Sequence, residues 1–217
     1  MSAEQGLLLP FDFQTYWLHA SGEGGGADFD LKMERDAHRL PLLRGKHVAG
    51  LLRLALERAA AWGWFADAAG PDDLDIPDLL MGGRSDGRPG CLDVRSAVIR
   101  QPLAGILRSD QAMTEACFQR LATTAIEPLH GVAREKHLRT IEAALPLPLQ
   151  ARVRFAPADR LAWCGLDAGA IGQVDRAAAE WRKWVRLAWP AVDEAGAKRT
   201  RGFGRLRPAD CVDESLS

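Results

Sequence analysis

The pattern of apolar and polar positions predicts strands alternating with helices. Residues 7–19, LLLPFDFQTYWLH, alternate roughly between apolar and polar side chains and predict a first strand. Residues 45–65 predict the clearest helix, because apolar side chains recur there at helical spacing: Val48, Leu51, Leu52, Ala55, Leu56 and Ala59. Residues 145–157 predict a strand whose buried face carries Leu149, Ala151, Val153 and Phe155, and residues 167–189 predict a second long helix.

Weaker patterns fill in the rest of the order. Residues 30–36 and 91–99 alternate over short stretches and predict two more strands, and residues 195–208 predict a loop followed by a strand. Residues 66–90, which are acidic and rich in Gly and Pro, and residues 101–135, which we expect to be mostly irregular, are predicted insertions. The order indicates one α+β domain over residues 1–217, an RRM/ferredoxin-like antiparallel sheet with helices on one face and loop or hairpin insertions.

Composition fits a globular protein of the cytoplasm. The 217 residues are 47% apolar, and no apolar run approaches the roughly 18–20 residues that span a membrane. The first residues lack the basic start and cleavage pattern of a signal peptide, so we expect a cytoplasmic protein without a membrane partner. The four cysteines contain no C-x-x-C pair, which argues against a zinc site and predicts reduced, mostly buried thiols: Cys91, Cys117, Cys164 and Cys211.

Charge is segregated along the chain although the net charge is only −1. Residues 182–207 carry eight Lys or Arg against two Asp or Glu, whereas residues 66–86 carry six Asp and one Arg. Of the 28 basic residues, 23 are arginine, which pairs with phosphate in a forked geometry and stacks on bases. A positive face on a neutral protein is therefore possible, and it is compatible with RNA binding.

Three stretches in a fixed order carry a family resemblance. They are SGEGGGADFDLKMERDAHRLPLLRGKHVAGLLR near the start, AIEPLHGVAREKHLRTIEAALPLPLQARV past the middle, and RTRGFGRL near the end. Together they resemble the RAMP superfamily of CRISPR effector subunits, and most of all the repeating backbone subunit that binds the guide RNA (crRNA) in type III complexes.

The resemblance implies a catalytic carboxylate in the first stretch. In type III backbone subunits, an Asp after the glycine-rich loop is needed for divalent-metal-dependent cleavage of the paired target RNA. Asp30 matches the family spacing better and Asp28 is the second candidate, with Asp30 as the expected contact to Mg²⁺ or Mn²⁺. Two solvated loop aspartates are the alternative. Gly24 and Gly25 would present backbone N–H groups to RNA phosphates.

The resemblance also implies which other residues contact RNA. Lys46, His47 and Arg53 lie near the start of the first predicted helix, where free N–H groups suit a phosphate, although Arg53 equally fits a solvated helix residue. In the central stretch the expected contacts are Arg134 and Lys136. In the last stretch glycines let the backbone approach RNA closely, and the expected contacts are Arg199, Arg201, Gly202, Phe203, Gly204 and Arg205.

The expected function is thus a crRNA-binding backbone subunit of a type III CRISPR ribonucleoprotein that cleaves target RNA. Its partners would be crRNA, target RNA, other CRISPR effector subunits and copies of itself stacked head-to-tail. Two alternatives stay open: a non-catalytic capping or scaffold subunit of the same complex, and a metal-independent guide-processing endoribonuclease that would use a histidine such as His130 or His137. Trp181 and Trp184 are interpreted as core residues rather than as a base-stacking platform.

Overall fold

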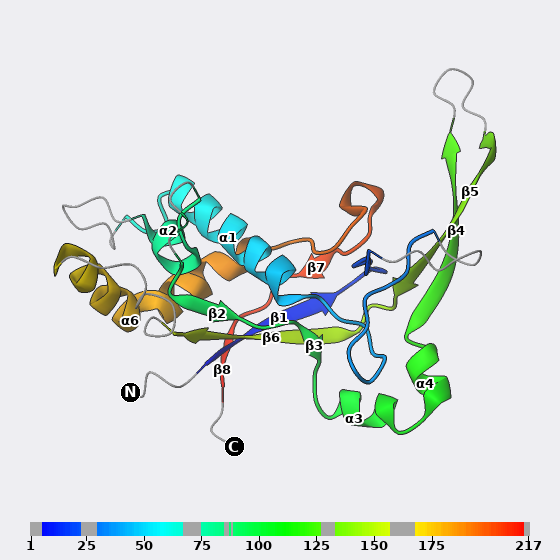
Figure 1. The fold of residues 1–217 in the computed structure, drawn as a ribbon, viewed down its shortest axis with the longest axis horizontal. Coiled ribbons are helices and arrows are strands. Elements are labelled where there is room, and N and C mark those ends of the chain that lie inside the picture. Colours follow the sequence, from blue (N-terminus) through cyan, green and yellow to red (C-terminus); the bar gives the residue numbers. More distant parts are fainter. Residues whose placement is uncertain are drawn as a thin grey trace.

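A six-stranded antiparallel sheet with two long helices forms the body of the protein (Figure 1). The computed structural model describes residues 6–22, 30–66, 75–84, 87, 89–126, 133–156 and 168–214, without the side chains of 124–126, 133–138 and 168–171. The elements β1 (Leu7–Phe13), α1 (Gly45–Ala61), β2 (Leu92–Val94), β6 (Pro148–Phe155), α6 (Ala168–Ala188) and β7 (Leu206–Arg207) follow the ferredoxin-like order β-α-β-β-α-β. In space the strands are ordered β2-β6-β1-β7, so the predicted fold class is confirmed.

Strict alternation explains the two central strands. In β1 every second side chain is buried, and β6 alternates in the same way, so both strands turn one face towards the core. They pair antiparallel, with Leu9 opposite Ala151 and Phe11 opposite Leu149. The predicted strand over residues 145–157 is therefore confirmed. The first strand is shorter than predicted, because the chain leaves the sheet after Phe13 and Trp17 instead makes a single bridge to Ala144.

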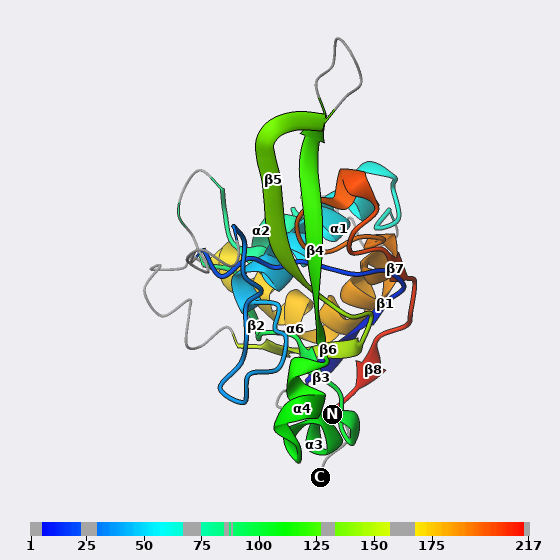
Figure 2. The same ribbon diagram turned by 90° about the vertical axis from the view of Figure 1, so that its right-hand side faces the viewer.

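The long helices pack together on one side of the sheet, as Figures 1 and 2 show. The six apolar residues that predict α1 are all buried, which confirms that helix. In α6, Trp181 and Trp184 are each 1% exposed, so their interpretation as core residues is also confirmed. The 3₁₀ turn η1 (Trp189–Ala191) follows α6, and its Trp189 meets the ring of Phe11 edge-on.

Short elements complete the edges of the sheet. The strand predicted over residues 91–99 is broken into β2 and β3 (Val98–Ile99), which pair with different parts of β6. β8 (Val212–Asp213) pairs with the start of β1, and the 3₁₀ turn η2 (Arg199–Arg201) precedes β7. Within the predicted insertion at residues 66–90, the structure places the short helix α2 (Ile76–Met81) against α1.

Residues 101–135 are not mostly irregular, and this expectation was wrong. They form α3 (Leu103–Arg108), α4 (Gln111–Glu115), β4 (Phe118–Ile126) and the start of β5 (Ala133–Ala144). β4 and β5 pair as a long hairpin that projects from one end of the molecule (Figures 1 and 2). The two strands pair with each other rather than with the main sheet, so the hairpin needs little of the apolar periodicity by which a core strand is recognised.

Residues 30–36 also differ from the prediction, because they make isolated bridges instead of a strand. Leu31 bridges to Ile141 of β5, Met33 to Ala20, and Arg35 to Pro41. Each bridge goes to a different neighbour, so no continuous ladder can form. The segment instead ties the base of the hairpin to the body of the protein.

A buried ion-pair network holds this junction. Glu142 of β5 is 6% exposed; its Oε1 accepts from Arg35 Nη2 at 2.7 Å and its Oε2 accepts from the Met33 amide at 3.1 Å. The Arg35 guanidinium also lies 3.7 Å from the centre of the Phe118 ring. Arg35 Nη1 also lies 3.5 Å from Glu115, but neither Nη1 nor Nε makes a hydrogen bond. The network therefore ties the base of the hairpin to residues 33–35, although it leaves part of the buried guanidinium unsatisfied.

Three cysteines are buried free thiols, as predicted: Cys91, Cys117 and Cys211. Burial raises the pKa of Cys211 to about 12, which keeps that thiol protonated and unreactive. Cys164 lies outside the described residues. Within the described part of the chain, none of the helices is both long and apolar enough to cross a membrane.

Candidate nucleic-acid interface

A basic loop, residues 195–205, lies against the segment that follows β1. The amide of Ala197 donates to the Leu18 carbonyl at 2.7 Å, and the amide of Gly204 donates to the Tyr16 carbonyl at 2.8 Å. Gly204 has a φ of +71°, and a Cβ at this position would overlap the carbonyl oxygen of Ala195. Glycine is therefore required for the loop to close so tightly.

Side chains of the basic loop differ in their burial and in their neighbours. Phe203 is half-buried and packs against the core, whereas Arg205 is exposed and its amide donates to Thr15 Oγ1 at 3.1 Å. The positive charge of Arg199 disfavours protonation of His47 at the start of α1. The positive charge of Arg201 repels that of Lys198.

Asp30 lies at the base of the hairpin, next to β5. Its amide donates to the Thr140 carbonyl at 2.9 Å, and its Oδ2 accepts from the Thr140 amide at 2.7 Å. These two hydrogen bonds fix Asp30 to the backbone of β5. Lys198 of the basic loop interacts with both Arg139 and Asp30, which places the loop and the hairpin base in one electrostatic cluster.

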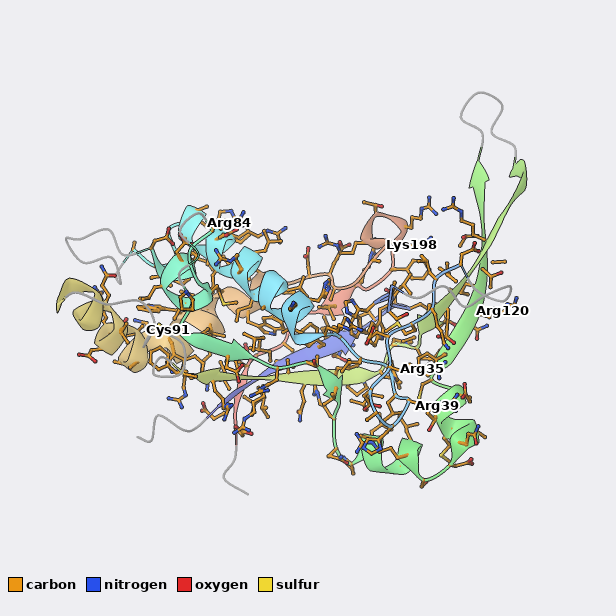
Figure 3. The ribbon with its side chains drawn as sticks, in the orientation of Figure 1. Arg35, Arg39, Arg84, Cys91, Arg120 and Lys198 are labelled. Carbon is orange, nitrogen blue, oxygen red and sulfur yellow. The ribbon has the colours of Figure 1, made fainter. Side chains whose placement is uncertain are left out.

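Lys198 has a lowered pKa, first because it is partly desolvated and then because Arg201 and Arg139 repel its positive charge. Asp30 opposes this shift, so the carboxylate only partly compensates the neighbouring cations. Figure 3 shows Lys198 on the loop that faces the hairpin, with Arg35, Arg39 and Arg120 at the same end of the molecule and Arg84 at the other end. Arg35 and Arg39 pair there with Glu142 and Glu115, so the suitability of this end for a polyanion rests on the basic loop and Arg139.

The start of α1 meets the basic loop through a pair of histidines. His47 Nε2 accepts the Gly196 amide at 3.0 Å, and the ring centres of His47 and His19 are 4.9 Å apart. Burial, then His19 and Arg199, lower the pKa of His47 to about 4, so its ring is neutral at pH 7. His47 thus holds the loop, while Lys46 beside it is exposed and accessible to an RNA phosphate.

Arg53 lies apart from this surface. Its guanidinium pairs with Asp78 at 2.9 Å and donates to the Gly82 carbonyl, and it lies 3.5 Å from Glu57. These contacts tie α1 to α2, which favours a structural role over RNA contact.

Of the predicted set, Asp30 and Arg201 each interact electrostatically with Lys198, which together with Arg139 was missed by the sequence analysis. Arg139 lies inside the second quoted family stretch and Lys198 directly precedes the third, so their basic character was a usable signal, but only the fold shows that they interact. Gly24, Gly25 and Asp28 lie outside the described residues. Arg134 and Lys136 fall in β5, whose side chains are not described there.

The residues described around Asp30 do not fit a resident divalent metal. Mg²⁺ or Mn²⁺ calls for several oxygen ligands, whereas one carboxylate oxygen here already accepts an amide and the charge that interacts with it, Lys198, is a cation. Among the described residues, no group of three or more His, Cys, Asp or Glu could hold a metal.

The fold and this surface define an α+β, ferredoxin-like domain in which a glycine-closed basic loop faces an inserted hairpin. The sequence matches the RAMP superfamily over residues 11–207, and the chain belongs to that superfamily. The structure is similar to a chain of the cryo-EM structure of the type III-B Cmr-beta bound to cognate target RNA. The TM-score is 0.56 at 10% sequence identity, over 97% of this chain and 96% of that chain. A search among curated proteins found no significant match.

Proposed function

We propose that this chain is a crRNA-binding backbone subunit of a type III CRISPR ribonucleoprotein. The cationic end formed by the basic loop and the hairpin base is the observation that carries the proposal. Membership of the RAMP superfamily and the likeness in fold to a chain of an RNA-bound type III-B assembly support it. In this role the subunit holds the guide through phosphates and shape, while base pairing selects the target.

The proposed partners are crRNA, target RNA, other CRISPR effector subunits and further copies of the chain. Copies would stack head-to-tail along the guide, a heterologous contact that builds a filament rather than a closed ring. The elongated body, with its hairpin at one end, is compatible with such stacking (Figure 1).

The test is to purify the tagged chain with its native neighbouring proteins and to sequence the RNA that survives nuclease treatment. Fragments of uniform length with repeat-derived ends are expected. Arg201→Gln/Arg205→Gln should lower the yield of protected RNA, whereas Arg84→Gln/Lys183→Gln, which removes the same charge elsewhere, should not. Purification without RNA in low salt would contradict the proposal.

Metal-dependent cleavage of target RNA through Asp30 stays a prediction of the sequence resemblance. The neighbourhood of Asp30 favours the second candidate, a non-catalytic RNA-binding subunit of the same machinery, because one oxygen already accepts an amide and the carboxylate interacts with the cation of Lys198. Incubating the assembled complex with complementary RNA in Mg²⁺ decides between them. Cleavage that Asp30→Asn abolishes would establish the catalytic role, and intact target would favour the second candidate.

A further inference from the structure

A groove runs along the C-terminal half of α6, beside β8. It has a volume of about 720 Å³, and Asp213 of β8 lines one side of it. Five residues of α6 line the other side at spacings of three and four, so they share one face of the helix: Ala179, Arg182, Lys183, Arg186 and Leu187. The buried residues of α6, among them Trp181 and Trp184, lie on the opposite face. This α6 groove is therefore on the outer side of the helix.

Contacts within the chain give the α6 groove a fixed shape. Arg186 Nη2 lies 2.5 Å from Asp213 Oδ1, and Arg186 Nη1 donates to the Cys211 carbonyl at 2.8 Å, so the guanidinium joins α6 to β8. The Arg182 guanidinium carbon lies 4.9 Å from the centre of the Trp181 ring, and this contact orients the side chain. A surface whose shape is already fixed loses little conformational entropy when a partner binds.

The α6 groove is largely apolar, and its charged groups are mainly cations. Leu187 is 40% exposed, and the aliphatic stems of Arg182 and Lys183 add further apolar surface. The three cations of the groove face one carboxylate, Asp213, so the net charge of the groove is about +2. An occupant of matching chemistry therefore has apolar side chains flanked by carboxylates.

Position and chemistry favour a protein over RNA as the occupant. β8 pairs with Leu7 and Leu8 at the start of β1, whereas the basic loop is hydrogen-bonded to Tyr16 and Leu18 beyond the end of that strand. Figure 1 likewise shows β8 apart from the loop that precedes β7. A phosphate backbone would pair with the cations, but it has no aliphatic side chain with which to cover Leu187.

The α6 groove has the length and the charge spacing of a helix-binding site. From Ala179 to Leu187 it follows α6 over about two turns, and its cations recur from one turn to the next. Acidic side chains three or four residues apart on a second helix would meet these cations, and the apolar side chains between them would enter the groove. We propose that the α6 groove binds an acidic, amphipathic helix of a partner protein. The site is separate from the RNA-binding surface and does not rest on the proposed function.

The experiment measures binding of a fluorescein-labelled peptide to the full chain by anisotropy at low salt. The peptide has about 18 residues, all Glu, Leu or Ala, arranged so that one face of its helix is apolar, and a second peptide has Lys in place of Glu. The unaltered chain should bind the Glu peptide about tenfold more tightly than the Lys peptide. Leu187→Ser should weaken binding of the Glu peptide about tenfold, because an apolar contact is lost. Ile106→Ser, at a side chain 54% exposed outside the groove, should leave it unchanged.

Reversing one charge gives the sharper test. Lys183→Glu brings the net charge of the groove to about zero, so it should weaken binding of the Glu peptide about fivefold and tighten binding of the Lys peptide. The matched control Lys32→Glu makes the same change at an exposed lysine outside the groove and should alter neither affinity. Both variants should keep the Tm of the unaltered chain, because both side chains are exposed. A fluorescein-labelled single-stranded RNA should bind Lys183→Glu and the unaltered chain equally.

The outcomes separate this site from the proposed function. If the unaltered chain does not bind the Glu peptide, or if Lys183→Glu and Lys32→Glu have equal affinities for it, the docking site is overturned and the proposed function stands. If Lys183→Glu weakens binding of the labelled RNA but not of the peptide, the groove is an RNA contact and the docking proposal is wrong. Failure of the unaltered chain to bind the labelled RNA, together with purification free of RNA alongside its neighbours, would overturn the proposed function and leave the docking site standing.

Discussion

Replacing Gly204 by alanine tests how tightly the basic loop is closed. Gly204 has a φ of +71°, and an added Cβ would overlap the Ala195 carbonyl oxygen and lie 3.0 Å from its carbonyl carbon. The Gly204 amide donates to the Tyr16 carbonyl at 2.8 Å, and its own carbonyl accepts from the Ala195 amide at 2.9 Å. Relieving the overlap must therefore move backbone that makes two hydrogen bonds.

Gly202 provides the matched control two residues away. It has a φ of +79°, but nothing lies within 4 Å of an added Cβ. Alanine there suffers only the left-handed conformation, about 1 kcal/mol. At Gly204 the same cost is joined by two weakened hydrogen bonds of about 1 kcal/mol each, for a total of about 3 kcal/mol.

Thermal unfolding followed by circular dichroism measures the difference. For a chain of this length, about 1 kcal/mol shifts the Tm by roughly 2–4 °C, so Gly202→Ala should lower it by about that much and Gly204→Ala by roughly 6–12 °C. Gly204→Ala should also bind the labelled RNA more weakly, because the loop that carries Lys198 and Arg201 is displaced. Equal Tm shifts for the two variants would refute the close contact with Ala195.

Other substitutions separate stability from RNA binding. The pKa of His47 is lowered from 6.5 to about 4, so the unfolded state takes up a proton first and the free energy of unfolding should fall as pH drops from about 6.5 to 4. His47→Gln should flatten this fall in urea titrations, and parallel curves for the two proteins would contradict it. Glu142→Ala leaves a buried cation without its partner and should cost about 3–5 kcal/mol of unfolding free energy, whereas Glu115→Ala, at a side chain 44% exposed, should cost less than about 1 kcal/mol. Arg53→Met should lower the free energy of unfolding by about 1–3 kcal/mol and leave RNA affinity unchanged. Lys46→Gln should leave stability unchanged, weaken RNA binding and reduce the salt slope of binding to single-stranded RNA by about 0.7. If Arg53→Met lost RNA affinity without losing stability, Arg53 would be an RNA contact and its structural role would be refuted.

Local pattern was sufficient wherever burial has a regular period. The stripe from Val48 to Ala59 predicts α1, and the alternation from Leu149 to Phe155 predicts β6, because each element turns one face to the core. The hairpin of β4 and β5 lacked such a signal, since its strands pair mainly with each other. Residues 30–36 alternate like a strand but have three separate bridging partners, and only the assembled fold reveals these.

The sequence by itself determined the class of the fold, the family, and the basic, glycine-rich character of the C-terminal loop, because these depend on residue types at local spacings. The tertiary structure decided which charges meet. Arg53 forms an ion pair with Asp78 of α2, and His47 accepts the Gly196 amide of the basic loop. Lys198 interacts electrostatically with Asp30, which lies 168 positions away in the chain. Such long-range proximity depends on how the sheet, the loop and the hairpin pack together, and no local pattern encodes it.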